Sequence, residues 1–233
     1  MKISVLTFPG SNCDHDAYEA FAVRGHEVTA VWHKSHALGN PDLVILPGGF
    51  SYGDYLRCGA IAKFSPIVQE VIAFARKGGL VLGICNGFQI LTETGLLPGA
   101  LMMNRSLQFI CRHQYIRVET DKTPWTHGIP VGTALDIPIA HKEGNFYIEV
   151  DGLKALQDND QVVFRYCDKD VNVTPEANPN GSIDNIAGIC NTQRNVLGMM
   201  PHPERAAEDF VVSRDGKLIL AAIERYFTGR YCS

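Results

Sequence analysis

The sequence predicts an α/β fold, because its first half alternates short apolar runs with segments of helical spacing. Strand-length runs occupy residues 3–8, 27–32, 43–46 and 80–84, and helical patterns occupy residues 13–24 and 67–76. Such alternation is typical of a parallel sheet covered by helices on both faces. With the second half included, we expect a three-layer sandwich with a mixed, mostly parallel central sheet.

Each element of the first half has a local signal. The helix over 13–24 is predicted from Ala17, Phe21 and Ala22 at helical spacing, followed by Gly25. The helix over 67–76 ends before Gly78 and Gly79, and the run after it is apolar throughout. Ligands of parallel sheets gather at the carboxyl ends of the strands, so the residues after positions 46 and 84 are candidates for a site.

After Leu101 the pattern changes to strand-like runs, which favour antiparallel or mixed pairing. Strands are predicted over 113–119, 134–140, 145–150 and 162–166, a hairpin over 186–190 and 196–200, and a closing helix over 217–227. Residues 173–184 contain Pro175, Pro179 and Gly181, which predict an exposed loop. With no internal repeat or linker in the sequence, we expect a single domain over 1–233.

Composition narrows the possible partners. The chain has 233 residues, 45% of them hydrophobic, a formal net charge of −4 and a pI of about 6.0. No basic run favours binding to nucleic acid or to an anionic membrane, and no apolar stretch approaches the length of a membrane span. The seven cysteines are irregularly spaced, without a C-x-x-C motif, which favours reduced thiols in the cytoplasm and predicts no metal site.

The most informative residue is Cys85, in the segment Gly83-Ile84-Cys85-Asn86-Gly87 that follows an apolar strand. Strand, tight turn and helix in this order predict a nucleophile elbow, whose flanking glycines let neighbouring backbone pass closely. At a helix N-terminus the thiolate is favoured over the thiol, so we expect Cys85 to be a nucleophile. The alternative is a buried cysteine that only fills space.

A second polar group ends another apolar run near the C-terminus, where His202 and Glu204 alternate with Pro201 and Pro203. The prolines favour extended backbone, in which residues two apart face the same side, so the imidazole and carboxylate are expected to lie together. A histidine that takes a thiol proton and a carboxylate that orients it would complete a triad with Cys85. A solvated surface turn is the alternative reading.

The third group is the glycine-rich loop after the strand over 43–46, which begins Pro47-Gly48-Gly49. Adjacent glycines permit close backbone approach, and such a loop can direct an N–H at a developing oxyanion. We predict Gly49 as one donor and Asn86, directly after the nucleophile, as the other.

Together, the Pro-Gly-Gly loop, the Gly-x-Cys-x-Gly elbow followed by Gln89, and the late His-Pro-Glu resemble the class I (triad) glutamine amidotransferase family, which implies a flavodoxin-like sheet. The resemblance spans nearly the whole chain. Residues 8–14, 49–54, 83–89, 137–145 and 200–204 are similar to one branch of the family, which supplies ammonia to purine biosynthesis. Lys142 departs from that branch, where glycine is expected.

The resemblance implies that Cys85 attacks the side-chain amide of L-glutamine, forming a γ-glutamyl thioester and ammonia. Gln89, one helical turn past Cys85, would contact the glutamine. His141 and Glu143 form another polar pair at a strand end and could line the glutamine pocket or be solvated. Arg105 could meet the substrate carboxylate, because guanidinium suits bidentate pairing, or could face water.

Partners and cofactors are also implied. The chain has no G-x-x-x-x-G-K-[ST] motif, although ammonia from a glutaminase is normally used on an acceptor. The resemblance therefore implies a separate large synthetase subunit that carries ATP and magnesium, a small bridging subunit, and no cofactor in this chain. The segments 51–57 and 141–145 flank the expected pocket and are candidates for coupling the two active sites.

Three alternatives stay open at this point. A glutaminase for another acceptor would keep the same triad. A non-glutaminase elbow-cysteine protein, such as a chaperone, deglycase or redox sensor, as a rule lacks the late His-Pro-Glu. An α/β-hydrolase with cysteine in place of serine is weaker, because its acid usually precedes its histidine, whereas Glu204 follows His202.

Overall fold

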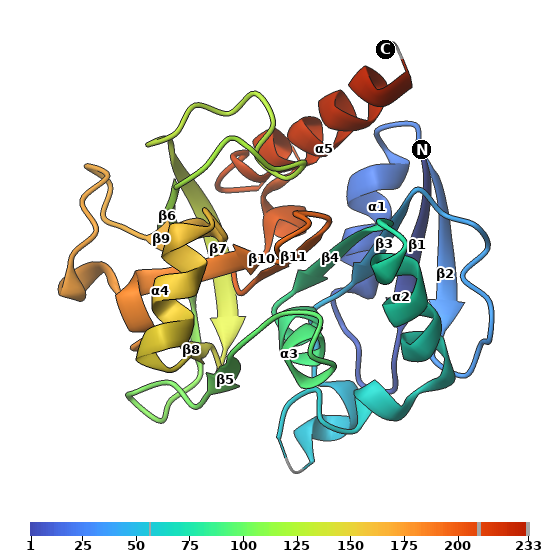
Figure 1. The fold of residues 1–233 in the computed structure, drawn as a ribbon, viewed down its shortest axis with the longest axis horizontal. Helices are drawn as coiled ribbons and strands as arrows, with labels where there is room; N and C mark the ends of the chain where they lie inside the picture. Colours follow the sequence, from blue (N-terminus) through green and yellow to red (C-terminus); the bar gives the residue numbers. More distant parts are fainter. Residues whose placement is uncertain (56, 209–210, 232–233) are drawn as a thin grey trace.

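The computed structural model describes residues 1–55, 57–208 and 211–231, which form one large mixed sheet with helices around it (Figure 1). The nine strands lie in the order β2-β1-β3-β4-β11-β10-β9-β6-β7. The pairs from β2 to β11 are parallel and the remaining pairs are antiparallel. The predicted mixed, mostly parallel sheet is confirmed.

The strands of this sheet are β1 (Lys2–Thr7), β2 (Glu27–Trp32), β3 (Leu43–Leu46), β4 (Leu80–Ile84), β6 (Ile110–Val118), β7 (Ala134–His141), β9 (Val162–Tyr166), β10 (Ile186–Cys190) and β11 (Val196–Met199). A second, two-stranded sheet pairs β5 (Ala100–Met102) with β8 (Asn145–Tyr147). The helices are α1 (Asp14–Ala22), α2 (Pro66–Arg76), α3 (Asn86–Glu93), α4 (Val150–Asp158) and α5 (Gly216–Tyr231). None of the helices within the described ranges is long and apolar enough to cross a membrane.

The central strands β3, β4 and β11 are buried along their whole length. Strands covered on both faces cannot alternate polar with apolar residues, which is why these segments read as continuous apolar runs. Their register pairs Leu46 with Gly83 and Ile84 with Met199. The chain therefore leaves β3, β4 and β11 at the same edge of the sheet.

The crossovers place helices on both faces. From β1 the chain crosses through α1 to β2 on one side, and from β3 through α2 to β4 in the opposite direction along the sheet. Because such crossovers are right-handed, α1 and α2 cover opposite faces. The C-terminal helix α5 lies on the α1 side of the sheet (Figure 1). There Arg24 donates two hydrogen bonds of 2.6 Å to Glu224 of α5.

Two predictions for the second half are wrong. The strand expected over 145–150 stops at Tyr147, and Glu149 then caps helix α4, whose one buried side chain is Leu156. The stretch 173–184 is not an exposed loop, because Asn180 and Ser182 are 1% and 2% exposed. Both side chains bond the carbonyl of Gly144, so this segment supports the turn after β7.

Candidate active site

Cys85 occupies the turn between β4 and α3 in a strained backbone conformation, with φ 51° and ψ −104°. An L-residue at positive φ outside the normal left-handed region costs roughly 1–3 kcal/mol and persists only where its surroundings enforce it. Here the Cys85 N–H donates to the carbonyl of Met199 at 2.8 Å, and the Cys85 carbonyl accepts from Gln89 N–H at 3.2 Å. The predicted elbow is present, with the thiol at the N-terminus of α3.

The elbow depends on two glycines that have no room for a side chain. A Cβ on Gly87 would lie 2.0 Å from the carbonyl oxygen of Leu46, and a Cβ on Gly83 would lie 2.8 Å from the backbone of Gly87. Helix α3 therefore packs directly on the backbone of β3 and β4. This close contact fixes where Cys85 stands relative to the sheet.

His202 and Glu204 form a buried pair beyond the end of β11. His202 Nδ1 lies 2.7 Å from Glu204 Oε1, and the two residues are 1% and 4% exposed. The pairing of the two side chains was predicted correctly, but the backbone geometry that produces it was not. Glu204 lies in a short 3-10 helix, Pro203–Ala206, instead of in extended chain. The His202 N–H donates to Pro138 O at 2.8 Å, which fixes this turn against β7.

The electrostatics of His202 favour a protonated imidazole. Burial alone would lower its pKa, but the charge of Glu204 and the neighbouring Cys85 outweigh burial and hold the pKa well above its ordinary value. Within the described chain, no group accepts from or donates to Nε2 with hydrogen-bond geometry. The Cys85 thiol instead faces the carbonyl of Ala140 at 3.5 Å. The imidazole is therefore oriented by Glu204 at one nitrogen and available for proton transfer at the other.

One predicted oxyanion donor follows Cys85 in the chain, and the other lines the same cavity. Asn86 is the first residue of α3, where a helix has backbone N–H groups without intrahelical partners. Gly49, with φ 147°, lines the same cavity as Cys85, and a Cβ there would lie 2.8 Å from the backbone of Asn12. Gly48 provides the close approach to the imidazole, since a Cβ on it would lie 2.5 Å from His202 Cε1. Their role as oxyanion donors stays a prediction.

Cys85 opens into a cavity of about 340 Å³, called here the Cys85 cavity. That volume is at the small end of the range for ligand sites, roughly 300–1,000 Å³, and suits a small metabolite. Its walls include Gln89, His141 and Glu143, as predicted. Arg105 is exposed and is not part of the wall, so the structure does not bring it to the site. The other lining residues are Gly49, Phe50, Asp54, Cys58, Met103, Phe109, Ala140 and Lys142.

Gln89 is already engaged in a hydrogen-bond chain. Its Oε1 accepts from Asn86 Nδ2 at 2.8 Å, and its Nε2 donates to the carbonyl of Glu143 at 2.7 Å. Asn86 Oδ1 in turn accepts from the Ser51 N–H at 3.2 Å. Gln89 thus joins the elbow helix to both loops that flank the cavity, in addition to lining the pocket.

His141 and Glu143 do not pair with each other. His141 Nδ1 lies 3.1 Å from Asn104 Oδ1, and burial lowers the His141 pKa to about 3, with a smaller effect from His202. The imidazole is therefore neutral near pH 7. Glu143 Oε2 accepts from the Cys58 N–H at 3.3 Å. The two side chains reach the cavity from a common turn but have different partners.

Lys142 does not disturb that turn. Its side chain is exposed, and its carbonyl accepts from the Asn104 N–H at 2.8 Å. The position in this turn that requires glycine is Gly144, where a Cβ would lie 2.4 Å from His141 Nδ1. The departure at Lys142 is accommodated because its side chain points away from the packed ring.

Sequence reasoning missed several residues of the site. One of them is Cys13, whose thiol lies near the His202 ring. Both groups lie against Gly48, since a Cβ on Gly48 would be 3.4 Å from Cys13 Sγ and 2.5 Å from His202 Cε1. Its signal was available, since Cys13 follows the first strand at the same sheet edge. Asn104, which holds His141, lies in a loop without any motif. In the described chain, Cys13, His202 and Glu204 are the one group with three metal-ligating atoms close together, within 4.8 Å.

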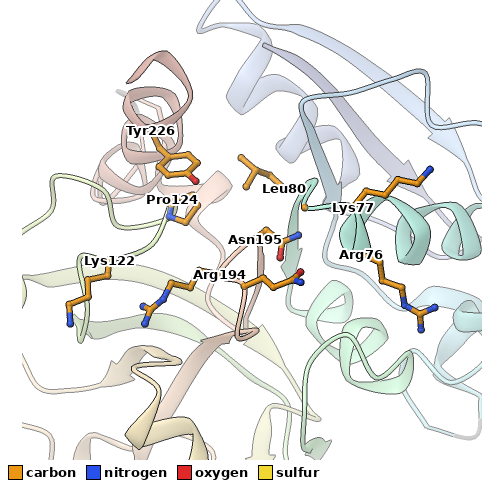
Figure 2. A pocket seen from close by; sticks show the side chains of 10 residues that line it. Arg76, Lys77, Leu80, Lys122, Pro124, Arg194, Asn195 and Tyr226 are labelled. Carbon is orange, nitrogen blue, oxygen red and sulfur yellow. The ribbon is translucent and has the colours of Figure 1, made fainter. Parts of the chain in front are cut away.

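A second cavity, of about 430 Å³, lies where β4 and β11 begin (Figure 2). Its walls include Arg76, Lys77 and Arg194, and the charged ends of Arg76 and Lys77 point away from each other. Lys122, also in the wall, is paired with Asp160 at 2.9 Å. It contains no nucleophile with a base and is at the opposite edge of the sheet from Cys85. The Cys85 cavity is therefore the candidate active site.

Comparison with known proteins agrees with this geometry. Residues 1–218 match the CobB/CobQ-like glutamine amidotransferase domain family. The chain belongs to this family. This amidotransferase is 59% identical over 217 residues to the phosphoribosylformylglycinamidine synthase subunit PurQ of Koribacter versatilis, covering 93% of this chain and 94% of that protein. It is 56% identical to the same subunit of Moorella thermoacetica, covering 96% and 95%.

Solved structures are similar as well. The structure of PurLQS from Thermotoga maritima matches this amidotransferase with a TM-score of 0.86 and 42% identity, covering 97% of this chain and 98% of that chain. Another glutamine amidotransferase from Thermotoga maritima matches with a TM-score of 0.56 at 15% identity, covering 100% and 86%. The second likeness shows the fold alone.

Proposed function

We propose that the protein is the glutaminase subunit of phosphoribosylformylglycinamidine synthase. It hydrolyses L-glutamine and delivers the ammonia to a synthetase subunit that converts formylglycinamide ribonucleotide to formylglycinamidine ribonucleotide with ATP, in de novo purine biosynthesis. The observation that carries the chemistry is the buried His202–Glu204 pair, whose open imidazole nitrogen is beside the elbow thiol. Full-length similarity to the two PurQ subunits supports the choice of acceptor.

The reaction follows from the positions of these groups. With the thiol proton already on His202, the Cys85 sulfur attacks the side-chain amide carbon of glutamine. The tetrahedral oxyanion is met by N–H groups of Asn86 and Gly49. His202 then gives its proton to the leaving nitrogen, which releases ammonia and leaves a γ-glutamyl thioester. Water attacks the thioester with His202 as base, and glutamate leaves as the Cys85 thiolate is restored.

The partners belong to this proposal. A large synthetase subunit and a small bridging subunit are favoured by the similarity to the Thermotoga maritima PurLQS structure. ATP and magnesium are expected on the synthetase, and no cofactor is expected in this chain. A cytoplasmic location suits a biosynthetic subunit and the six described cysteines, all of which are free thiols, while Cys232 is outside the described residues.

Other readings have less support. A glutaminase for another acceptor would use the same triad, but the curated relatives of this chain at 52–59% identity are named as PurQ. A non-glutaminase elbow-cysteine protein has no need of a buried histidine–glutamate pair beside its thiol, and here His202 and Glu204 form such a pair.

The deciding experiment measures glutamate release from L-glutamine by the purified chain, with and without a synthetase loaded with formylglycinamide ribonucleotide and ATP. Cys85→Ala is the control. We expect slow release alone, strong stimulation in the complex, and loss of both in the variant. Turnover by the isolated chain as fast as in the complex would contradict the proposed coupling, and no release under any condition would contradict the glutaminase.

A further inference from the structure

Cys13 brings a second thiol to the His202 ring, from the loop that follows β1. Its side chain is 8% exposed, and its thiol donates to Asn12 Oδ1 at 3.3 Å. The Cys13 N–H donates to the carbonyl of Gly48 at 3.2 Å, so this cysteine is tied to the glycine that packs against the imidazole. The glutaminase reaction described above has no step for the Cys13 thiol, although the thiol is held beside the base.

The side chains of Cys13, His202 and Glu204 together form a compact group of metal-ligating atoms, called here the Cys13 cluster. One sulfur, one imidazole nitrogen and one carboxylate oxygen lie within 4.8 Å of one another, and the three residues are 8%, 1% and 4% exposed. Around a tetrahedral zinc ion, with bonds of roughly 2.0–2.3 Å, the ligand atoms are about 3.3–3.6 Å apart. The cluster therefore has to contract by about 1 Å, which a rotation of about 30° at χ1 of the cysteine provides.

Two polar atoms of the Cys13 cluster have no partner of their own. His202 Nε2 and Glu204 Oε2 are both buried, and neither makes a hydrogen bond to any residue that the structure describes. Buried polar atoms are normally paired, and an open carboxylate oxygen in a buried site favours a positive charge beside it. A metal ion bound by the cluster would supply that charge to Glu204.

The structure also leaves room for an ion beside the cluster. Cys13 and His202 line a pocket of about 60 Å³, which shares Gly49 and Phe50 with the wall of the Cys85 cavity. A water molecule takes roughly 30 Å³ in the liquid, so the pocket can hold a metal ion together with one water. Arg205 lines the same pocket and opposes a cation, but its side chain is exposed, so solvent and salt screen its charge.

We propose that Cys13, His202 and Glu204 bind a zinc ion, and that this ion inhibits the enzyme. One thiolate, one imidazole and one carboxylate suit Zn²⁺, and three protein ligands with a water in the fourth position is a common zinc arrangement. Binding releases the thiol proton of Cys13 and the proton on the coordinating nitrogen of His202. The ligands come from segments near opposite ends of the chain, so no sequence motif indicates the site.

Inhibition follows from the two roles of His202. Glu204 orients the ring through Nδ1, and Nε2 is the nitrogen left for proton transfer. A zinc ion on either nitrogen therefore removes one of the two functions that the base needs. The inhibition rests on the proposed glutaminase function, whereas the binding of the metal does not.

The first experiment reads metal binding without turnover. Co²⁺, which enters zinc sites and gives a thiolate-to-metal absorption band, is titrated into the reduced protein. We expect the band in the wild type, in Cys85→Ala and in Cys111→Ser, whose exposed cysteine makes it the matched control, and we expect Zn²⁺ to displace the Co²⁺. Cys13→Ser should lose the band and bind Co²⁺ at least 10-fold more weakly, because even the loss of an outer-shell partner costs about 10-fold to 100-fold in affinity.

A second variant and an activity assay complete the test. Glu204→Gln should also weaken Co²⁺ binding, and it tests the site if circular dichroism shows that Cys13→Ser does not fold. In the complex with the synthetase, the Zn²⁺ concentration that halves glutamate release should rise at least 10-fold in Cys13→Ser and stay unchanged in Cys111→Ser. The synthetase is the same in each assay, so its own response to Zn²⁺ does not affect this comparison.

The possible failures are distinguishable. A band that persists in Cys13→Ser but is lost in Cys85→Ala would place the metal on the nucleophile and overturn the proposed site, as would the absence of any band in the wild type. Equal sensitivity of Cys13→Ser and the wild type to Zn²⁺ would overturn the inhibition. If the wild type binds Co²⁺ as expected but releases no glutamate even without metal, the proposed glutaminase fails while the metal site stands.

Discussion

Replacing Gly87 with alanine tests whether the close packing of α3 on β3 sets the position of the nucleophile. The new Cβ would lie 2.0 Å from the Leu46 carbonyl oxygen, whereas ordinary contact begins at 3.4 Å, so the helix has to move by about 1.4 Å. Forced overpacking costs roughly 1–3 kcal/mol, and the better helix propensity of alanine returns at most about 1 kcal/mol. We expect a net loss of up to about 2 kcal/mol in the free energy of unfolding.

The same displacement should reduce activity more than stability. A shift of about 1 Å in a reacting group lowers a rate by on the order of 100-fold. Gly229→Ala is the matched control, because Gly229 is also helical, in α5, and a Cβ there would meet no atom of the described residues within 4 Å. That variant should gain about 0.5–1 kcal/mol and keep full activity.

The assay pairs urea unfolding, followed by circular dichroism, with glutamate release in the complex. A Gly87→Ala protein that is as stable as Gly229→Ala and retains wild-type turnover would refute the argument that backbone contact positions the elbow. A stable protein with low turnover would still support the positioning role.

Three further predictions follow from the charged groups. Glu204→Gln should lower kcat by about 10²-fold to 10⁴-fold, and it should lower the pKa of His202. Because the fold raises the pKa of His202, the stability that this histidine provides is full below about pH 6.5 and is lost as pH rises. The difference in urea midpoint between the wild type and the variant should therefore shrink at high pH. His141→Asn should flatten the acid loss of stability, since lowering the pKa from 6.5 to about 3 costs the wild type on the order of 5 kcal/mol once pH has fallen through this window. A variant whose urea midpoint falls between pH 7 and pH 4 as much as that of the wild type would refute this. Glu224→Gln should lower the free energy of unfolding by about 1 kcal/mol at pH 7, a small effect because the ion pair is partly exposed. Burial raises the pKa of Glu224, but the bonds to Arg24 and His26 outweigh burial and lower it. The effect of the substitution should therefore vanish once acid protonates the carboxylate.

The sequence predicted best the elements whose burial is uniform. Strands β3 and β4 were predicted with their observed bounds, because a strand buried on both faces carries a continuous apolar run. Helix α4 was missed because the strand expected over 145–150 ran into its first residue, and because Gly152 and a single buried side chain, Leu156, give it a weak helix signal. The segment 173–184 was misread because prolines and glycine indicate turns but say nothing of whether other residues cover them.

The site divides in the same way. Cys85, His202 and Glu204 follow apolar strands within short motifs, so their chemistry could be predicted from local sequence. Arg105 was chosen for its chemistry without a structural anchor, and the structure leaves it outside the cavity. Asp54 was not singled out, because its place in the cavity wall depends on a left-handed backbone that the sequence does not indicate. Residues that distant parts of the chain bring to the site carry no short sequence motif, so they could not be predicted from the sequence.

The pairing of β4 with β11 has a consequence for how the protein is made. Cys85 and His202 come from segments separated by about half the chain, and the Cys85 N–H bonds the carbonyl of Met199 at the end of β11. During synthesis the elbow sequence leaves the ribosome long before its base does. A nascent chain whose β11 is still inside the ribosome therefore has the Cys85 thiol without the His202 base. Such a chain should not hydrolyse glutamine until β11 has paired with β4.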